Sequence, residues 1–232
     1  KIVGFGNKEF ESFSIIRYSH DPNDPNSLSS NRISKILEDV NNQLWVATFD
    51  HGLNKLTTST QTHYPATFKH YQATKKKKNG LITDHIITLF EDHSNNIWVG
   101  SGGGGLFKWT PSEENFISYS SEVSGDIIYN IGEDAEENLW ILTNRGITRM
   151  KFEEGNVLAN SFLQENGLQG NIFNKDAFYE DSAGHFYLGG NRGFNYFDPL
   201  TIQTDHFTPP VEITEVQVIN KPVSISNSLD NP

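Results

Sequence analysis

Four adjacent pairs of acidic residues recur along the chain, and such pairs can supply the two carboxyl groups of an acid–base mechanism. The pairs are Glu38-Asp39, Glu91-Asp92, Glu133-Asp134 and Glu180-Asp181. Two carboxyl groups can act as general acid and general base only when both reach the same substrate. Each pair ends a short apolar run that is typical of a β-strand, where neighbouring side chains point to opposite faces of the sheet. We therefore interpret the repeated Asp as a turn residue that binds backbone amides.

The other motifs that could carry chemistry are incomplete. The glycine run after Ser101 has the composition of a phosphate-binding loop, but such a loop continues into Lys-Ser or Lys-Thr and then a helix. Here 106–109 reads as a strand, so we expect a hairpin turn. The histidines are scattered without the spacing of a metal site, and 134–145 lacks the central Gly and terminal Glu of a calcium loop. The sequence predicts no catalytic residue, no metal site and no cofactor.

The acidic pairs belong to a repeat with a fixed internal spacing. Six residues after each Asp stands a large aromatic residue, and six or seven residues further on stands a glycine. The aromatic residues are Trp45, Trp98, Trp140 and Tyr187, and the glycines are Gly52, Gly105, Gly146 and Gly193. The aspartates are 53, 42 and 47 residues apart. A period of this size indicates one supersecondary unit copied along the chain.

Each unit reads as four short β-strands. An apolar run such as 33–37 precedes the Asp, a polar turn follows it, and a second strand such as 44–48 contains the aromatic residue. A glycine turn leads to a third strand such as 52–56, and a fourth such as 68–71 closes the unit. Four antiparallel strands in about 47 residues is the size of one β-propeller blade. The frequent Gly and Asn argue against helices.

The predicted fold class is therefore all-β, a β-propeller of about four blades with four antiparallel strands each, plus part of a fifth blade. Residues 1–18 match the end of a unit, so we expect the tail of a preceding blade there and the four blades in 19–208. The double proline at 209–210 breaks the pattern. Residues 209–232 are predicted to hold a linker and the first strand of a different domain, and the segment is expected to belong to a larger propeller.

The repeated aromatic residue invites a functional interpretation that we reject. The same ring stands at the same place in every unit, which is most simply explained by a wedge between neighbouring blades. Replacing one such buried Trp with Ala is expected to cost about 3–5 kcal/mol of stability.

The charge balance argues against some classes of partner. The chain of 232 residues has 29 acidic and 18 basic side chains and a formal net charge of −11, which disfavours nucleic acid and anionic membrane surfaces. The chain contains no cysteine, no apolar run long enough to span a membrane and no signal-peptide pattern at its start. We expect no nucleic-acid contact and no direct membrane contact by this segment.

Three features together resemble a known family. One is the pattern Asp-x5-Trp-[Val/Ile]-x-[Thr/Ser], followed by Gly-Leu as in Gly52-Leu53 and Gly105-Leu106. The others are the Asp-, Asn-, Pro- and Ser-rich link 21–31 and the final unit 166–199, with Pro-Pro-Val-x-Ile-Thr after it. This series resembles the two-component-regulator propeller repeats in the periplasmic sensor region of Bacteroides-type hybrid two-component system histidine kinases. The tail resembles the start of the immunoglobulin-like (Y_Y_Y) domain that follows those propellers.

The resemblance implies a role in signal transduction. It implies a periplasmic, ligand-binding part of an inner-membrane sensor histidine kinase that detects glycan fragments and regulates polysaccharide-utilisation genes. The implied partner is an oligosaccharide, and a homodimer could form through the full sensor domain. Two departures, the lysine run 75–78 after the first repeat and the missing glycine pair in the third and fourth repeats, are expected to alter only the loop surface.

Blade topology places the candidate ligand-binding residues. The loops that lead into each first strand and those between second and third strands emerge on one face around the central axis. The candidates on this face are Asn31, Arg32, Asp50, His51, Asp84, His85, Asn144, Arg145, Asn171, Asn174, Asn191 and Arg192. Amide and guanidinium groups beside aromatic rings, here Phe49, Tyr129 and Phe173, suit polyhydroxy ligands because they offer paired hydrogen bonds next to an apolar platform.

Two alternatives to a non-enzymatic ligand sensor stay open at this point. The propeller could be a scaffold that docks a protein partner or a second copy. It could also be a lyase or glycosidase, which needs two acidic side chains that converge on the channel. Asp50 and Asp84 are the acidic candidates on the predicted face.

Overall fold

The computed structural model describes residues 16–57, 66–74 and 80–202, and the backbone of 217–218 and 221–222. The chain divides into two compact units, residues 1–202 and residues 203–232. In the second unit, β16 (Gln217–Val218) and β17 (Lys221–Pro222) form an antiparallel pair. Most of the predicted blade tail at 1–18, the lysine run 75–78 and most of the predicted linker and strand at 209–232 lie outside the described residues.

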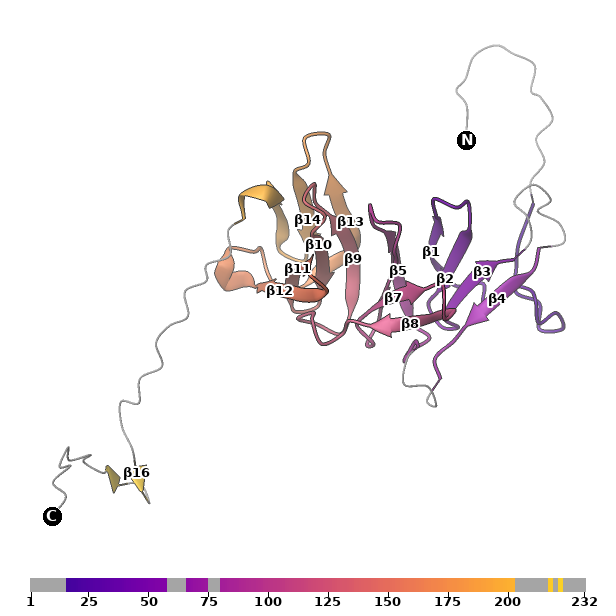
Figure 1. Ribbon diagram of the computed structural model, residues 1–232, viewed down its shortest axis with the longest axis horizontal. Helices are drawn as coiled ribbons and strands as arrows, with labels where there is room; N and C mark the ends of the chain where they lie inside the picture. The colour runs from indigo at the N-terminus through magenta and orange to yellow at the C-terminus, as the bar shows by residue number, and fades with distance from the viewer. Residues whose placement is uncertain (1–15, 58–65, 75–79, 203–216, 219–220, 223–232) are drawn as a thin grey trace, which may run out of the picture. The chain divides into compact units, whose positions relative to one another are not determined.

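The first unit contains four antiparallel sheets that follow one another along the chain and lie side by side (Figure 1). They are numbered blades 1 to 4. Blade 1 comprises β1 (Ile33–Glu38), β2 (Leu44–Thr48), β3 (Leu53–Leu56) and β4 (Phe68–Tyr71). Blade 2 comprises β5 (Ile86–Glu91), β6 (Ile97–Ser101), β7 (Leu106–Thr110) and β8 (Asn115–Ser118).

The other two blades repeat this order. Blade 3 comprises β9 (Ile128–Glu133), β10 (Leu139–Thr143), β11 (Gly146–Glu153) and β12 (Asn156–Phe162). Blade 4 comprises β13 (Phe173–Glu180), β14 (Phe186–Gly190) and β15 (Gly193–Phe197). The described helices are the short 3₁₀ turns η1 (Gln164–Asn166) and η2 (Pro199–Thr201). No helix in the described part of the chain is long and apolar enough to cross a membrane. The all-β propeller prediction is confirmed, with the difference that blade 4 has three strands among the described residues.

The repeated Asp organises the turn between the first and second strands, as predicted. In blade 3, Oδ1 of Asp134 accepts the backbone amides of Glu136 and Asn138, each at 3.0 Å. Its other oxygen, Oδ2, accepts the indole N–H of Trp140 at 2.7 Å. The turns at Asp39, Asp92 and Asp181 have the same arrangement, with a tyrosine hydroxyl in place of the indole at the last. The bond to the ring, which the sequence analysis did not foresee, explains the fixed spacing of six residues.

The tryptophans are wedges between successive blades. Each of Trp45, Trp98 and Trp140 is at most 1% exposed and lies in a cluster of apolar residues from the next blade. Trp45, for example, contacts the edge of Trp109 in blade 2, with ring centroids 5.2 Å apart. The wedge prediction is confirmed for these three rings. Tyr187 differs, because its ring is half-buried and contacts other rings of its own blade.

The Glu of two acidic pairs, Glu91 and Glu133, joins neighbouring blades, a role that was not predicted from the sequence. Glu91 in blade 2 accepts the backbone amide of Val40, in the turn of blade 1, at 3.0 and 3.1 Å. Glu133 in blade 3 likewise accepts the amide of His93, in the turn of blade 2, at 2.7 Å. The two carboxylates of a pair therefore hold two different turns, which agrees with the prediction that they do not share a substrate.

The connections between second and third strands are bonded to the next blade. The amide of Gly52 donates to the carbonyl oxygen of Asp84 at 2.8 Å, and that of Gly146 donates to Asn171 at 2.7 Å. Gly52 has a φ of 72°, and a Cβ at this position would lie 2.2 Å from the carbonyl oxygen of Tyr71. These bonds confirm that the two sets of loops share one face, and they explain the repeated glycine. The outer connections between third and fourth strands vary instead, spanning 57–67, 111–114 and 154–155.

The first strand of blade 1 is less buried than the first strands of blades 2 and 3. Ile36 is 59% exposed, whereas Leu89 and Ile131, at the same register position in blades 2 and 3, are 3% and 6% exposed. Leu89 and Ile131 are each covered by the tryptophan of the preceding blade. Within the described ranges, no sheet packs against this side of β1.

Candidate functional site

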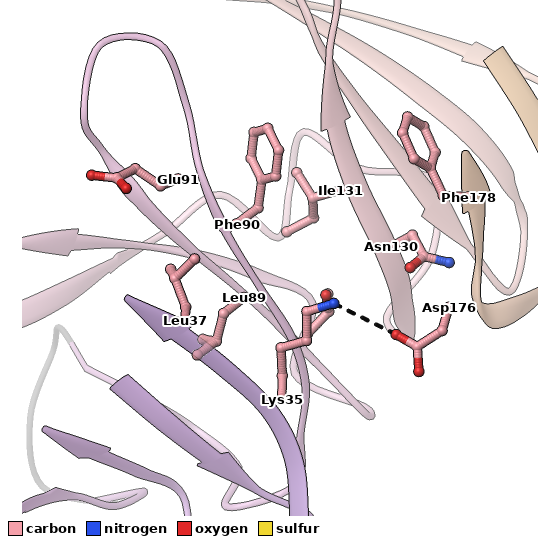
Figure 2. Close-up of a pocket in the computed structure, with 10 residues that line it drawn as sticks. Lys35, Leu37, Leu89, Phe90, Glu91, Asn130, Ile131, Asp176 and Phe178 are labelled. Carbon is pink, nitrogen blue, oxygen red and sulfur yellow. Dashed lines mark ion pairs between the residues drawn. The ribbon is translucent and has the colours of Figure 1, made fainter. Parts of the chain in front are cut away.

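The first strands of all four blades surround a hollow of about 500 Å³ (Figure 2). Each of these strands contains a register shift against its partner, and such bulges re-aim side chains next to binding sites. The shift in β13 is the largest, between Phe173 and Phe178, and within it Asp176 has a φ of 60°. Few residues other than glycine adopt this conformation, although Asp does so more readily than most. The bulge directs the side chains of Lys175 and Asp176 toward blade 1.

Two lysines connect blade 4 to blade 1 beside the hollow. The ammonium group of Lys35 lies 3.7 Å from Asp176 (Figure 2). Lys175 lies 3.3 Å from the same carboxylate and donates a hydrogen bond of 2.8 Å to the carbonyl oxygen of Ser34. Ser34 and Lys175 are 141 positions apart in the sequence. These contacts bring the polar groups of the two outermost blades together.

The opposite wall of the hollow is aromatic and aliphatic. Figure 2 shows Ile131 between the rings of Phe90 and Phe178. Asn130 lies beside them and donates its side-chain amide to the carbonyl oxygen of Asn174 at 3.1 Å. Its side-chain oxygen has no hydrogen-bond partner among the described residues. The hollow therefore combines two half-buried aromatic rings with amide, ammonium and carboxylate groups.

Two of the predicted residues, Arg32 and His85, lie next to Phe49, which also contacts Lys175. The guanidinium carbon of Arg32 lies 6.0 Å from the centre of the Phe49 ring, and the ring of His85 lies 5.8 Å from it. The ammonium group of Lys175 lies 5.0 Å from the same centre. Phe49 thus links the predicted loop face to the hollow through Lys175. Positive charge over an aromatic face is attracted by the ring quadrupole.

Asp50 completes this group. Its carboxylate lies 3.2 Å from Arg32 and 3.1 Å from the ring of His51. Hydrogen bonds from the Ser30 hydroxyl and from His51 hold the pKa of the Asp50 carboxyl below its usual value of 3.8. Asp50 is therefore ionised at neutral pH and engaged by its neighbours.

Other predicted residues support the backbone. Asp84 accepts the amide of Ala73 at 2.7 Å through its side chain. Asn144 donates to Asp126 at 3.0 Å, and the side chains of Asn171 and Asn31 each accept a backbone amide. These hydrogen bonds fix the loops that surround the axis. The side chains of these four candidates therefore stabilise loops through hydrogen bonds.

The remaining predicted residues are exposed. The structure gives the side chains of Arg145, Asn191 and Arg192 no hydrogen bond or ion pair with other described residues, and Asn174 contributes its backbone carbonyl to Asn130. Of the aromatic residues expected nearby, Phe173 is 1% exposed and belongs to the core, so its expected place beside a ligand is wrong. No group of three potential metal ligands occurs among the described residues.

The residues that line the hollow were not predicted from the sequence, and they include Lys35, Phe90, Asn130, Asp176 and Phe178. Lys175, beside the hollow, was not predicted either. A signal was present. In the fourth repeat, polar residues occupy 174–176, where the other repeats have a mostly apolar run. A polar segment within a predicted inner strand indicates side chains that face the axis.

Comparison with known proteins identifies the repeat. The family model described as the two component regulator propeller matches residues 27–50 and 80–103, which contain the first two strands of blades 1 and 2. Two segments of this chain match the two-component regulator propeller repeat. The resemblance to this repeat is confirmed in these two segments. Blades 3 and 4 contain the same hydrogen bond from the ring to the repeated Asp.

Longer proteins contain similar propeller repeats. Histidine kinase P4 of Formosa agariphila is 27% identical over 217 residues, which cover 93% of this chain and 15% of the kinase. The solved extracellular domain of a hybrid two component system from B. thetaiotaomicron is 22% identical with a TM-score of 0.58, over 87% of this chain and 28% of that chain. Virginiamycin B lyase from Staphylococcus aureus is 12% identical with a TM-score of 0.51, over 82% of this chain and 61% of the lyase. The two structural comparisons establish similarity of fold.

Proposed function

We propose that this chain is a ligand-binding part of the periplasmic sensor region of a hybrid two-component histidine kinase, and that the hollow between its first strands binds a glycan fragment. The match to the propeller repeats and the similarity to a histidine kinase support the sensor role. The proposed consequence of binding is regulation of polysaccharide-utilisation genes by the whole protein.

The composition of the hollow carries the ligand proposal. Sugars present hydroxyl groups around their edge and C–H groups on their faces. Phe90 and Phe178 offer apolar surfaces, while Asn130, Lys35 and Asp176 offer donors and acceptors at fixed positions. A mostly apolar wall with a few converging polar groups is typical of small-molecule sites. The cluster at Phe49 would extend this surface toward a longer oligosaccharide.

Binding in the hollow could be transmitted because the hollow lies between blades. A ligand shifts a protein between two arrangements only when it binds one of them more tightly. Asp176 bonds to lysines from both blade 1 and blade 4, so a ligand that competes for this carboxylate would favour a different spacing of those blades.

Calorimetric titration of the protein with a panel of oligosaccharides tests the proposal. We expect heat from at least one of them and about tenfold weaker binding by Asn130→Ala, because a site that hydrogen-bonds a hydroxyl loses this contact. Arg145→Ala, on the same loop face but outside the hollow, is the matched control and should bind normally. Absence of heat from the whole panel, or equal binding by the Asn130 variant, would contradict the proposal.

The enzymatic alternative is less well supported. Asp50 is paired with Arg32 and His51, and Asp84 accepts a backbone amide. Of the acidic residues in the hollow, Glu91 holds the turn of blade 1 and Asp176 is paired with two lysines. Each of these carboxylates already has a positive or N–H partner, whereas a general acid needs a carboxyl group that keeps its proton near neutral pH.

A further inference from the structure

Three cationic side chains from blades 1 and 4 lie next to one another at the hollow. Lys35 and Lys175 both contact the carboxylate of Asp176, at 3.7 and 3.3 Å. Lys175 and Arg32 both lie over the ring of Phe49, at 5.0 and 6.0 Å from its centre. The three cations are therefore linked through two shared partners, one carboxylate and one aromatic ring.

The carboxylates that pair with these cations do not balance their charge. Asp176 is shared by the two lysines, and Asp50 pairs with Arg32. Three cationic and two anionic side chains leave one positive charge, on a chain whose formal net charge is −11. Glu91 also lines the hollow, but its carboxylate holds the turn of blade 1, and Figure 2 shows it pointing away from Lys35.

The three cations are accessible to a ligand. The side chains of Arg32, Lys35 and Lys175 are 69%, 39% and 28% exposed. Arg32 donates one hydrogen bond, to Asp50 at 3.2 Å, and its other N–H groups have no partner among the described residues. A guanidinium group has five N–H donors in a planar fork, which can bind two oxygens of one oxyanion with parallel hydrogen bonds.

We propose that the glycan fragment bound in the hollow is acidic, and that its carboxylate or sulfate group binds to Arg32, Lys35 and Lys175. This inference rests on the glycan-binding function proposed above and narrows the class of ligand. An anionic group offsets the repulsion between the two lysines that share Asp176, which a neutral sugar does not do. The half-buried ring of Phe49 offers apolar surface to the sugar that carries the acidic group.

Calorimetric titration with matched pairs of oligosaccharides tests the proposal. The panel contains oligosaccharides with uronic acid and oligosaccharides with sulfate esters, each beside its neutral counterpart made by carboxyl reduction or desulfation. We expect at least one acidic member to bind about tenfold or more tightly than its neutral counterpart. Its affinity should fall as the NaCl concentration rises from about 0.05 to about 0.5 M, because salt screens partly exposed charges. The two kinds of pair show whether the acidic group is a carboxylate or a sulfate.

Variants that remove single charges identify the groups that bind the acid. Lys35→Gln and Arg32→Gln should each weaken binding of the acidic oligosaccharide by about tenfold, whereas Lys35→Arg keeps the charge and should retain most of the affinity. Lys151→Gln is the matched control, because it removes a similarly exposed cation from the outer hairpin of blade 3, where Lys151 pairs with Glu153. This variant should bind like the wild type, and circular dichroism checks that each variant is folded.

Asp176→Asn separates an acidic ligand from a neutral one by the sign of its effect. The substitution removes the carboxylate that competes for the two lysines, so an acidic oligosaccharide should bind about threefold or more tightly. A neutral sugar that donates a hydroxyl group to Asp176 would bind less tightly instead.

The outcomes that would overturn the proposal are distinct from those that would overturn glycan binding itself. Equal binding of the acidic and neutral members in every pair would overturn the acidic ligand class and leave glycan binding in place. Weaker acidic binding by Asp176→Asn, or normal binding by both Lys35→Gln and Arg32→Gln, would overturn the assigned groups. Absence of heat from the whole panel, including its neutral members, would overturn both proposals.

Discussion

The carboxylate of Glu133 accepts the backbone amide of His93 at 2.7 Å and also contacts the ring of that histidine at 2.6 Å. Glu133 belongs to the first strand of blade 3, and His93 to the turn of blade 2. The Glu133 side chain is 4% exposed. A single buried carboxylate thus fastens the turn of one blade to the strand of the next.

This contact makes stability depend on pH in a defined direction. Burial raises the pKa of Glu133 above 4.5, and the hydrogen bonds from His93 only partly oppose this. Because folding raises the pKa, the contribution of Glu133 to stability is present below its unfolded-state pKa and is lost as pH rises through the folded-state pKa. Glu133→Gln can still accept the His93 amide but does not titrate. Its stability relative to the wild type should therefore improve as the pH rises from about 4 to 7, as measured by urea unfolding.

Glu113→Gln is the control for this experiment, because it removes one charge from an exposed position. The difference in the free energy of unfolding between each variant and the wild type cancels the titration of all groups that the two proteins share. A difference between Glu133→Gln and the wild type that is flat across this range, or that increasingly favours the wild type, would contradict the assignment.

The bond from the repeated Asp to the wedge ring can be tested in blade 3. In Asp134→Asn the remaining oxygen can serve the turn amides, but the new amide group cannot accept the indole N–H of Trp140. We expect a loss of about 1–3 kcal/mol in the free energy of unfolding, the usual cost of an unsatisfied buried donor.

Blade 4 supplies a matched control for that substitution. Tyr187 donates its hydroxyl to Asp181 at 3.3 Å, and a hydroxyl can also accept a hydrogen bond, whereas an indole N–H cannot. Asp181→Asn should therefore cost less than Asp134→Asn. Equal losses, measured by chemical denaturation, would show that the turn amides alone account for the conserved geometry of the repeat.

The requirement for glycine at position 52 has two separable causes. Gly52→Ala would place a Cβ 2.2 Å from the carbonyl oxygen of Tyr71 in a backbone with a φ of 72°. Gly184 has a φ of 85° with nothing within 4 Å of its Cβ position, so Gly184→Ala measures the conformational strain alone. We expect about 1 kcal/mol of destabilisation for Gly184→Ala, and about 3 kcal/mol or more for Gly52→Ala, which adds a clash with backbone. Thermal unfolding of the two variants gives the difference.

The wedge positions should differ in what they contribute. Trp140 is 1% exposed between two blades, so Trp140→Ala should cost about 3–5 kcal/mol. Tyr187 is half-buried, and Tyr187→Ala should cost less than about 2 kcal/mol because much of its ring is already in contact with water. Denaturant titrations at a concentration where each protein is monomeric would check this, and similar losses at the two positions would contradict it.

Much of the fold could be predicted because the repeat encodes it locally. The turn at Asp134 is made by residues within six positions of one another, and period-two patterns place Trp140 and its neighbours on defined faces of a strand. The role of Glu91 escaped prediction because its partner, Val40, lies 51 positions away in another blade. The adjacent positions of Glu91 and Asp92 in the sequence did not indicate that their side chains hold the turns of two different blades.

The hollow could not be predicted because it depends on the angle at which successive blades pack. That angle decides whether Lys175 can reach Ser34, 141 positions away, and no local pattern specifies it. The predicted loops do share one face, but the sequence did not distinguish side chains without a partner among the described residues, such as Arg145, from those that hold loops, such as Asp84. Both kinds of residue have the polar character that surface loops require.

The hydrogen bonds from Gly52 to Asp84 and from Gly146 to Asn171 tie the axial turns to their neighbours, whereas the peripheral hairpins 57–67, 111–114 and 154–155 differ in length. Changes of length are thus tolerated at the perimeter and restricted near the axis. An affinity tag or fluorescent probe inserted at 154–155 should therefore leave the architecture around the hollow unchanged. The same insertion at Gly146 would break the hydrogen bond to Asn171 that ties blade 3 to blade 4.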